Sequence, residues 1–175
     1  MNILICPDKF KGSLTARQVC DAVADGIRVI LPQAVIDSVP MADGGEGTCE
    51  LLTQWHQGRM VEVDVQGPLF CPVKARYGIS GDGSTAFIEM AEASGLTLLK
   101  PEERNPLLTS SVGTGEMIAD AMHRGVTNII LGIGGSATND AGIRMASALG
   151  YVFLDAGGDV LKPIGENLIH IHRLR

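Results

Sequence analysis

The loop at residues 132–140 has the residue types of a phosphate-binding site. Apolar residues 129–131 run into glycines, and small hydroxyl, amide and carboxylate side chains follow: Gly132, Gly134, Gly135, Ser136, Thr138, Asn139 and Asp140. Glycines let backbone N–H groups approach phosphate oxygens closely, and a helix beginning near Asp140 would add the positive end of its dipole. The Asp140 carboxylate could hold Mg²⁺, which prefers carboxylate and water oxygens. The loop therefore predicts a phosphate-handling α/β protein, in which Gly134, Gly135 and Ser136 cradle the phosphates.

The same loop also fits a dinucleotide-binding fingerprint. Residues 132–137 match G-x-G-x-x-G/A, and Asp155 follows near the expected distance. The loop lies far from the first strand–helix turn, however, and polar residues 138–140 follow it. We therefore favour a nucleoside triphosphate with a metal ion. A nicotinamide-dependent oxidoreductase and a glycine-rich turn without a ligand are the alternatives.

A second glycine-rich loop, at residues 42–48, carries two carboxylates. Asp43 and Glu46 alternate with three glycines, whereas a tight turn needs only one or two. Carboxylates beside backbone N–H groups suit a metal ion or a substrate hydroxyl. The loop therefore predicts a binding or catalytic role for Asp43, Gly44, Gly45 and Glu46.

Two further loops supply cations. Residues 7–13 contain Asp8, Lys9 and Lys11; the lysines offer mobile cations for a carboxylate or phosphate, and Asp8 could orient one of them or act as a base. Farther along, Arg104 could bind a carboxylate through two parallel hydrogen bonds, with Asn105 beside it. A solvated charged loop and a structured crossover are the respective alternatives.

Strands and helices are expected to alternate through the chain and to place these loops at strand ends. Residues 15–18 fit a helix-capping box. Residues 66–68 break the alternation, and hairpin-like strands follow at residues 73–79 and 85–90. We therefore predict mainly parallel, three-layer α/β architecture, with a domain boundary that separates residues 1–66 from residues 67–175.

Composition narrows the class of partner. The formal charge is −6 and aromatic residues make up 4 %, which disfavours nucleic acid and an anionic membrane surface. No apolar run is long enough to span a bilayer, and the first residues predict a strand instead of a signal peptide. The four cysteines lack metal-binding spacing, so we expect reduced thiols and a cytoplasmic protein.

Four motifs occur together in one order: residues 7–14, 42–48, 103–107 with 113–116, and 134–140. With them the chain closely resembles the bacterial class I glycerate kinases, from residue 2 to about residue 169. The resemblance implies ATP- and Mg²⁺-dependent phosphorylation of a small-molecule substrate, D-glycerate, usually to 2-phosphoglycerate, with 3-phosphoglycerate as the alternative product. It also implies two three-layer α/β domains of the glycerate kinase type, the second inserted into the first.

Each candidate residue then has a hypothetical role in phosphoryl transfer, which depends on positioning and charge neutralisation. The predicted catalytic residues are Asp43, Lys9 and Asp8, and Asp43 would orient or deprotonate the attacking hydroxyl. The substrate group is Lys11, Gly44, Gly45, Glu46, Arg104 and Asn105. Residues that bind the nucleotide are Gly134, Gly135, Ser136, Thr138 and Asn139. Asp140 is the expected metal ligand.

The chain departs from the family pattern in length and at two positions. Family kinases are roughly twice as long, so we expect a C-terminally truncated kinase whose first domain is left incomplete. A non-catalytic fragment and half of a split kinase are the alternatives, and the expected protein partner is a second copy of the chain or the missing C-terminal half. Ala141 and Arg144 stand where relatives usually carry glycines. The methyl group of Ala141 disfavours positive φ, and Arg144 would be accommodated if its side chain points to solvent.

Overall fold

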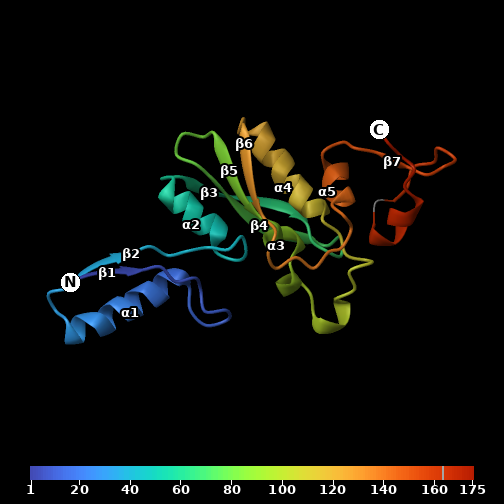
Figure 1. The fold of residues 1–175 in the computed structure, drawn as a ribbon. Helices are drawn as coiled ribbons and strands as arrows, with labels where there is room; N and C mark the ends of the chain where they lie inside the picture. The colour runs from blue at the N-terminus through green and yellow to red at the C-terminus, as the bar shows by residue number, and fades with distance from the viewer. Residues whose placement is uncertain (163) are drawn as a thin grey trace. The chain divides into compact units, whose positions relative to one another are not determined.

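The computed structural model describes residues 1–162 and 164–175, and it contains two compact units. The first unit is Met1–Asp43 and the second is Gly44–Arg175 (Figure 1).

The first unit is one strand–helix–strand repeat. Strands β1 (Asn2–Ile5) and β2 (Val35–Ser38) pair in parallel, and helix α1 (Ala16–Ile30) connects them (Figure 1). The predicted capping box is confirmed, because the Thr15 hydroxyl accepts from the Gln18 N–H and the Gln18 side chain accepts from the Thr15 N–H.

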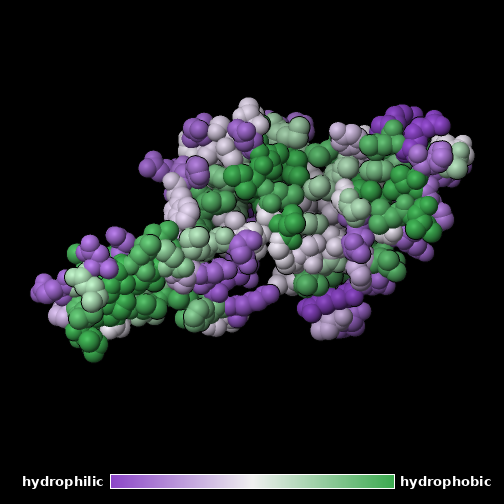
Figure 2. Space-filling model, viewed as in Figure 1, coloured by the Kyte–Doolittle hydropathy of each residue, from purple (hydrophilic) through white to green (hydrophobic). Residues whose placement is uncertain are grey.

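Much of the apolar surface of this unit is open. Ile5, Cys20 and Ala24 form its small core. Leu4, Val29, Ile30 and Val35 are 58–79 % exposed, and Figure 2 shows this unit as broadly apolar at its surface. A two-stranded parallel sheet buries too little area to be stable by itself, since parallel strands normally occur with both faces covered.

The second unit is built on a four-stranded sheet in the order β3–β4–β5–β6. Its strands are β3 (Arg59–Gln66), β4 (Pro72–Ile79), β5 (Thr85–Glu89) and β6 (Asn128–Gly132). The predicted hairpin-like strands are confirmed as β4 and β5, which pair antiparallel. Strand β3 also pairs antiparallel with β4, which was not predicted, whereas β5 and β6 pair in parallel.

Helices cover both faces of this sheet. Gly78 lies against Thr53 of α2 (Thr48–Trp55), while the next residue towards the start of β4, Tyr77, bonds to Asp120 of α4 (Val112–His123). Successive strand residues point to opposite faces, so α2 and α4 lie on opposite sides (Figure 1). The α/β fold class is thereby confirmed, with three layers in this unit.

The core of the second unit lies between the sheet and these helices. Its fully buried members include Ala75, Tyr77, Phe87, Ile88 and Met117. A short helix, α3 (Met90–Ser94), follows β5 directly and was not predicted, because five residues are too few for a helical period to show in a sequence.

The last part of the chain is a short helix and a small hairpin-like pair. Helix α5 (Ile143–Ala148) follows the loop at 132–140, and β7 (Phe153–Leu154) pairs antiparallel with β8 (Arg173–Leu174). Among the described residues, 3₁₀ helices lie in the connections: η1 (Leu96–Leu98), η2 (Pro101–Glu103) and the longer η3 (Gly165–His170).

The division between the two units differs in position from the predicted domain boundary. The units divide after Asp43, because β3 is hydrogen-bonded to β4 along its whole length and α2 packs on β4. A division of the kinase domains at residues 66 and 67 stays a prediction.

Candidate active site

Two glycine loops of the second unit meet backbone to backbone. The Gly134 N–H donates to the Gly44 carbonyl at 3.0 Å. A Cβ atom on Gly132 would lie 2.5 Å from the Gly44 carbonyl oxygen, and one on Gly134 would lie 2.7 Å from the Gly45 Cα. Glycine is therefore required at 132 and 134 by the close approach of two segments of the chain, in addition to any ligand.

This contact lies at the carboxyl end of the parallel pair. Glu89 ends β5 and is the register partner of Gly132, which ends β6. Ligands of α/β sheets bind beyond the carboxyl ends of parallel strands. The structure thus brings together Gly44, Gly45 and the loop at 134–136, as expected if they form one site.

Glu89 is a buried acid at this point that the sequence analysis did not identify. Its carboxylate is 5 % exposed and accepts the N–H of Cys49, in the first turn of α2, at 2.7 Å. The only sequence signal was a single carboxylate at the end of the apolar run 86–88.

Asp140 organises the other loop. It is 1 % exposed, and its carboxylate accepts the N–H of Ser111 at 2.8 Å, the Ser111 hydroxyl at 2.8 Å and the N–H of Gly142 at 3.0 Å. The Ser111 hydroxyl in turn accepts the Met145 N–H of α5. Asp140 and Ser111 therefore join the start of α4, the loop at 134–142 and the start of α5.

This arrangement bears on the predicted roles of the loop. The start of α4 already faces a carboxylate, and the predicted helix near Asp140 begins instead at Ile143, after Gly142. Among the described residues, no group of three or more His, Cys, Asp or Glu side chains could hold a metal ion. Asp140 as placed does not fit a Mg²⁺ ligand, because it is buried and its oxygens accept these donors; the metal role stays a prediction.

The remaining nucleotide-loop candidates lie at or near the surface. Ser136 and Thr138 are half-buried, with their hydroxyls 3.0 Å apart, and Asn139 is exposed. The Ser136 hydroxyl also accepts the Thr138 N–H. Hydroxyl and amide donors near exposed Gly135 are compatible with phosphate oxygens.

Both departures from the family pattern have structural consequences. Ala141 has φ +50°, in the left-handed region where a methyl group is disfavoured. Arg144 does not meet the condition of pointing to solvent: its guanidinium lies 4.6 Å from the centre of the Phe70 ring, and its Nε is buried without a hydrogen-bond partner among the described residues. Burial lowers the pKa of Arg144, and the nearby Asp140 opposes this.

Arg104 and Asn105 are exposed on the loop before α4. The Arg104 guanidinium donates to the carbonyls of Leu99 and Leu96 at 3.4 and 3.5 Å, and the Asn105 side chain accepts the Leu107 N–H at 3.1 Å. These bonds shape a turn. All of these side-chain bonds lie within residues 96–107, apart from the glycine loops in the sequence.

In the first unit, the structure brings the three predicted catalytic residues together. The Lys9 ammonium lies 3.5 Å from the Asp43 carboxylate, and the Lys9 N–H donates to Asp8 at 2.7 Å. The Met41 N–H donates to the Pro7 carbonyl and holds the two loops side by side. The Asp43 side chain is 64 % exposed, whereas that of Lys9 is 18 % exposed. Lys11 is exposed on the following turn.

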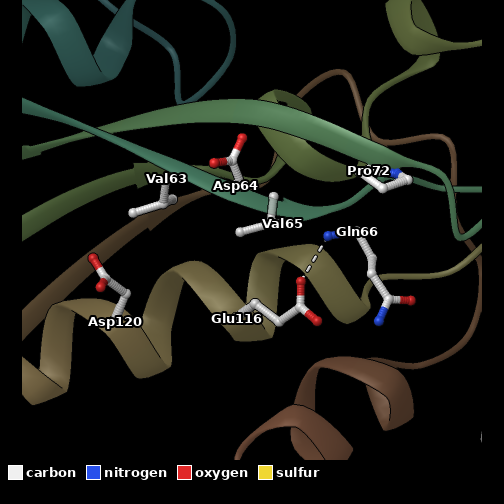
Figure 3. Close-up of a pocket in the computed structure, with 7 residues that line it drawn as sticks. All are labelled: Val63, Asp64, Val65, Gln66, Pro72, Glu116 and Asp120. Atoms are coloured by element: carbon white, nitrogen blue, oxygen red, sulfur yellow. Dashed lines mark hydrogen bonds between the residues drawn. The ribbon is translucent and has the colours of Figure 1, made fainter.

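A pocket of about 600 Å³ lies elsewhere, between β3 and α4 (Figure 3). It is lined by Val63, Asp64, Val65, Gln66, Pro72, Glu116 and Asp120, and Glu116 accepts the Gln66 N–H at 2.7 Å. Three carboxylates would repel an anionic substrate. None of the predicted site residues lines this pocket, so we do not assign the substrate to it.

The alternative dinucleotide site lacks its framework. In a Rossmann unit the strand that carries the acidic residue extends the same parallel sheet. Here β7, which precedes Asp155, pairs antiparallel with β8 in a separate two-stranded sheet, and Asp155 accepts the Asp159 N–H of its own turn. The match to the dinucleotide fingerprint therefore reflects the spacing of the glycines and is not accompanied by the sheet of a Rossmann unit.

Fold and site together define an α/β protein with paired glycine loops at the end of a parallel strand pair. The Glycerate kinase family model matches residues 3–175, and the chain belongs to this family. It is 55 % identical to Glycerate 2-kinase of Escherichia coli over 168 residues, which cover 96 % of this chain and 44 % of that protein. It is 53 % identical to Glycerate kinase of Haemophilus influenzae, over 94 % of this chain and 43 % of the relative.

A solved structure assigned to glycerate kinase 2 of Salmonella typhimurium LT2 has the same fold. Its TM-score is 0.84 at 48 % identity, over 100 % of this chain and 47 % of that one. The chain thus spans less than half the length of the relatives it matches. Among the described residues, no helix combines the length and the apolarity needed to cross a membrane.

Proposed function

We propose that this chain carries the N-terminal part of a glycerate kinase, which transfers the γ-phosphoryl group of ATP to D-glycerate and forms 2-phosphoglycerate. The observation that carries the proposal is the contact between the two glycine loops, at the carboxyl ends of β5 and β6, in a chain of this family. The 2-position follows the name of the Escherichia coli relative.

In this proposal each candidate group has a role. Asp43 accepts the proton of the attacking hydroxyl, whose oxygen bonds to the γ-phosphorus as ADP leaves. Lys9 and Lys11 neutralise phosphate or carboxylate charge, and Arg104 holds the glycerate carboxylate. Gly135, Ser136, Thr138 and Asn139 donate to the phosphates. Bound Mg²⁺ would neutralise phosphate charge, and no step above depends on its position.

We further propose that turnover needs the part of the kinase that this chain does not contain. The support is the exposed apolar surface around β1 and β2, together with the share of the relatives that is matched. The missing part would be joined in one polypeptide or supplied as a second chain. The protein would then act in the cytoplasm on a small molecule.

The test uses the purified 175-residue chain and a chimaera in which the remaining part of Escherichia coli glycerate 2-kinase follows residue 175. Both are given ATP, Mg²⁺ and D-glycerate, and the product is identified by ³¹P NMR. We expect 2-phosphoglycerate from the chimaera and none from the shorter chain. A folded chimaera without turnover would argue against the proposed function, and 3-phosphoglycerate would correct the position.

One substitution tests the base. Asp43→Asn in the chimaera should lower kcat by about 10²–10⁴-fold, the usual contribution of a positioned general base. Asp25→Asn is the matched control, because Asp25 is an exposed acid on α1 paired with Arg28. A loss of less than about tenfold would remove the base role from Asp43.

A further inference from the structure

The start of α2 depends on a carboxylate from another part of the second unit. The N-cap residue, Gly47, has φ +92° and offers no side chain to the helix. Helices leave their first N–H groups without internal partners, and a nearby negative charge stabilises them. Glu89, 40 residues away along the chain, accepts the Cys49 N–H at 2.7 Å and fills this role.

The segment that Glu89 holds is the glycine loop assigned to substrate. The Thr48 hydroxyl donates to the Gly45 carbonyl at 2.6 Å and accepts the Gly44 N–H at 3.1 Å, which closes the loop on itself. The Gly134 N–H binds the same loop from the other side. Through its hydrogen bond to Cys49, the Glu89 side chain therefore links this closed loop to the end of the parallel strand pair.

The surroundings of Glu89 are those of a fixed group. Glu89 is buried, and the Cys49 thiol beside it donates to the Phe87 carbonyl at 2.9 Å. Burial and then the charge of Glu89 raise the pKa of the Cys49 thiol to about 12. The thiol therefore stays neutral. Burying a carboxylate lowers the stability of the fold unless hydrogen bonds to that carboxylate offset the cost.

We propose that Glu89 is a positioning residue for the loop Gly44–Glu46, and that it sets the affinity for the acid substrate without touching it. This inference rests on the proposed function. The side-chain oxygen of residue 89 accepts the Cys49 N–H, so an amide should replace the carboxylate better than an apolar side chain of similar size. Small displacements of a binding loop are costly to catalysis.

The test compares Glu89→Leu, Glu89→Gln and Glu89→Asp in the chimaera, with Glu92→Gln as the matched control. Glu92 also accepts a backbone N–H, that of Arg76 at 3.0 Å, but it lies outside the loop. We expect Glu89→Leu to raise the KM for glycerate about tenfold or more and to leave the KM for ATP near its parental value. Glu89→Gln should restore most of the affinity, and Glu92→Gln should change neither KM.

Hydrogen exchange in the 175-residue chain provides a readout that does not need turnover. The Cys49 amide should exchange faster in Glu89→Leu and Glu89→Asp than in Glu89→Gln. If Glu89→Leu does not fold, Glu89→Asp replaces it, because a side chain shorter by one methylene cannot reach Cys49.

The outcomes separate the two proposals. A parent chimaera without turnover argues against the kinase activity, whereas parental exchange at Cys49 in Glu89→Leu or Glu89→Asp overturns the role of Glu89. An active parent with an unchanged KM for glycerate in these folded variants also overturns it, and so does an equal rise of both KM values.

Discussion

Charged residues are used differently in the two units. In Met1–Asp43 the candidate charges are Asp8, Lys9, Lys11 and Asp43; Asp43 and Lys11 are exposed, and the bond between Lys9 and Asp43 is 3.5 Å long. In Gly44–Arg175 the central acids are Glu89 and Asp140, which are buried and accept backbone N–H groups at 2.7–3.0 Å. Accessible charges can meet a substrate, whereas buried acids have become part of the framework.

The difference explains why loop composition is a poor guide to the role of an acid. Asp43 directly precedes the glycines of one motif and Asp140 ends the other, and the sequence predicted chemistry for both. The folded chain distinguishes them by burial and by the three donors around Asp140. The following variants test this contrast in the 175-residue chain, by urea unfolding.

The largest effect is expected from Asp140→Asn. The amide would place an N–H₂ group against Ser111 and Gly142 donors, so unfolding should become easier by about 2–3 kcal/mol. Asp43→Asn is the matched control and should change stability by less than about 0.5 kcal/mol, because its side chain is mostly in water. Equal losses at both positions would remove the contrast.

Gly134→Ala tests the contact between the glycine loops. Its Cβ would lie 2.7 Å from the Gly45 Cα, and relieving this overlap should cost about 1–3 kcal/mol. Gly26→Ala in α1 meets nothing within 4 Å and should stabilise by up to about 1 kcal/mol. A neutral Gly134→Ala would show that the loops can separate without loss.

Alkaline pH should weaken the second unit through Cys49. The unfolded thiol loses its proton near 9, whereas the folded thiol, with a pKa of about 12, keeps it. The unfolded state then binds fewer protons, so stability falls between pH 9 and pH 12, by about 1 kcal/mol per pH unit. Cys49→Ser keeps a hydroxyl donor and should flatten this slope. An unchanged slope would mean that other groups cause the loss.

The smallest effect should be a gain, from Ala141→Gly. Relief of the left-handed backbone at φ +50° should stabilise by about 0.5–1 kcal/mol. Ala22 lies in the middle of α1 and has an ordinary helical backbone, so Ala22→Gly should lower the free energy of unfolding by about 1 kcal/mol. Loss of stability at both positions would show that Ala141 is not strained.

Local patterns were sufficient for much of the fold. The capping box at Thr15, the hairpin-like strands that follow residues 66–68 and the strand before Gly132 were predicted, because each depends on neighbours in sequence. The position of the division between the units was not, because it depends on pairing between β3 and β4. The contact between Arg144 and the Phe70 ring was not predicted either, because the two residues are 74 positions apart in the sequence.

For the site, the sequence by itself determined which loops carry the motifs of the family and which residue types they offer. It placed Gly44 and Gly134 in separate loops, and their contact followed only from the folded chain. The tertiary structure alone decided that Asp140 binds Ser111 and that Glu89 caps α2. The physical reason is that the partners of a carboxylate can lie far away in the sequence. Burial then decides whether the carboxylate binds water, a substrate or backbone N–H groups.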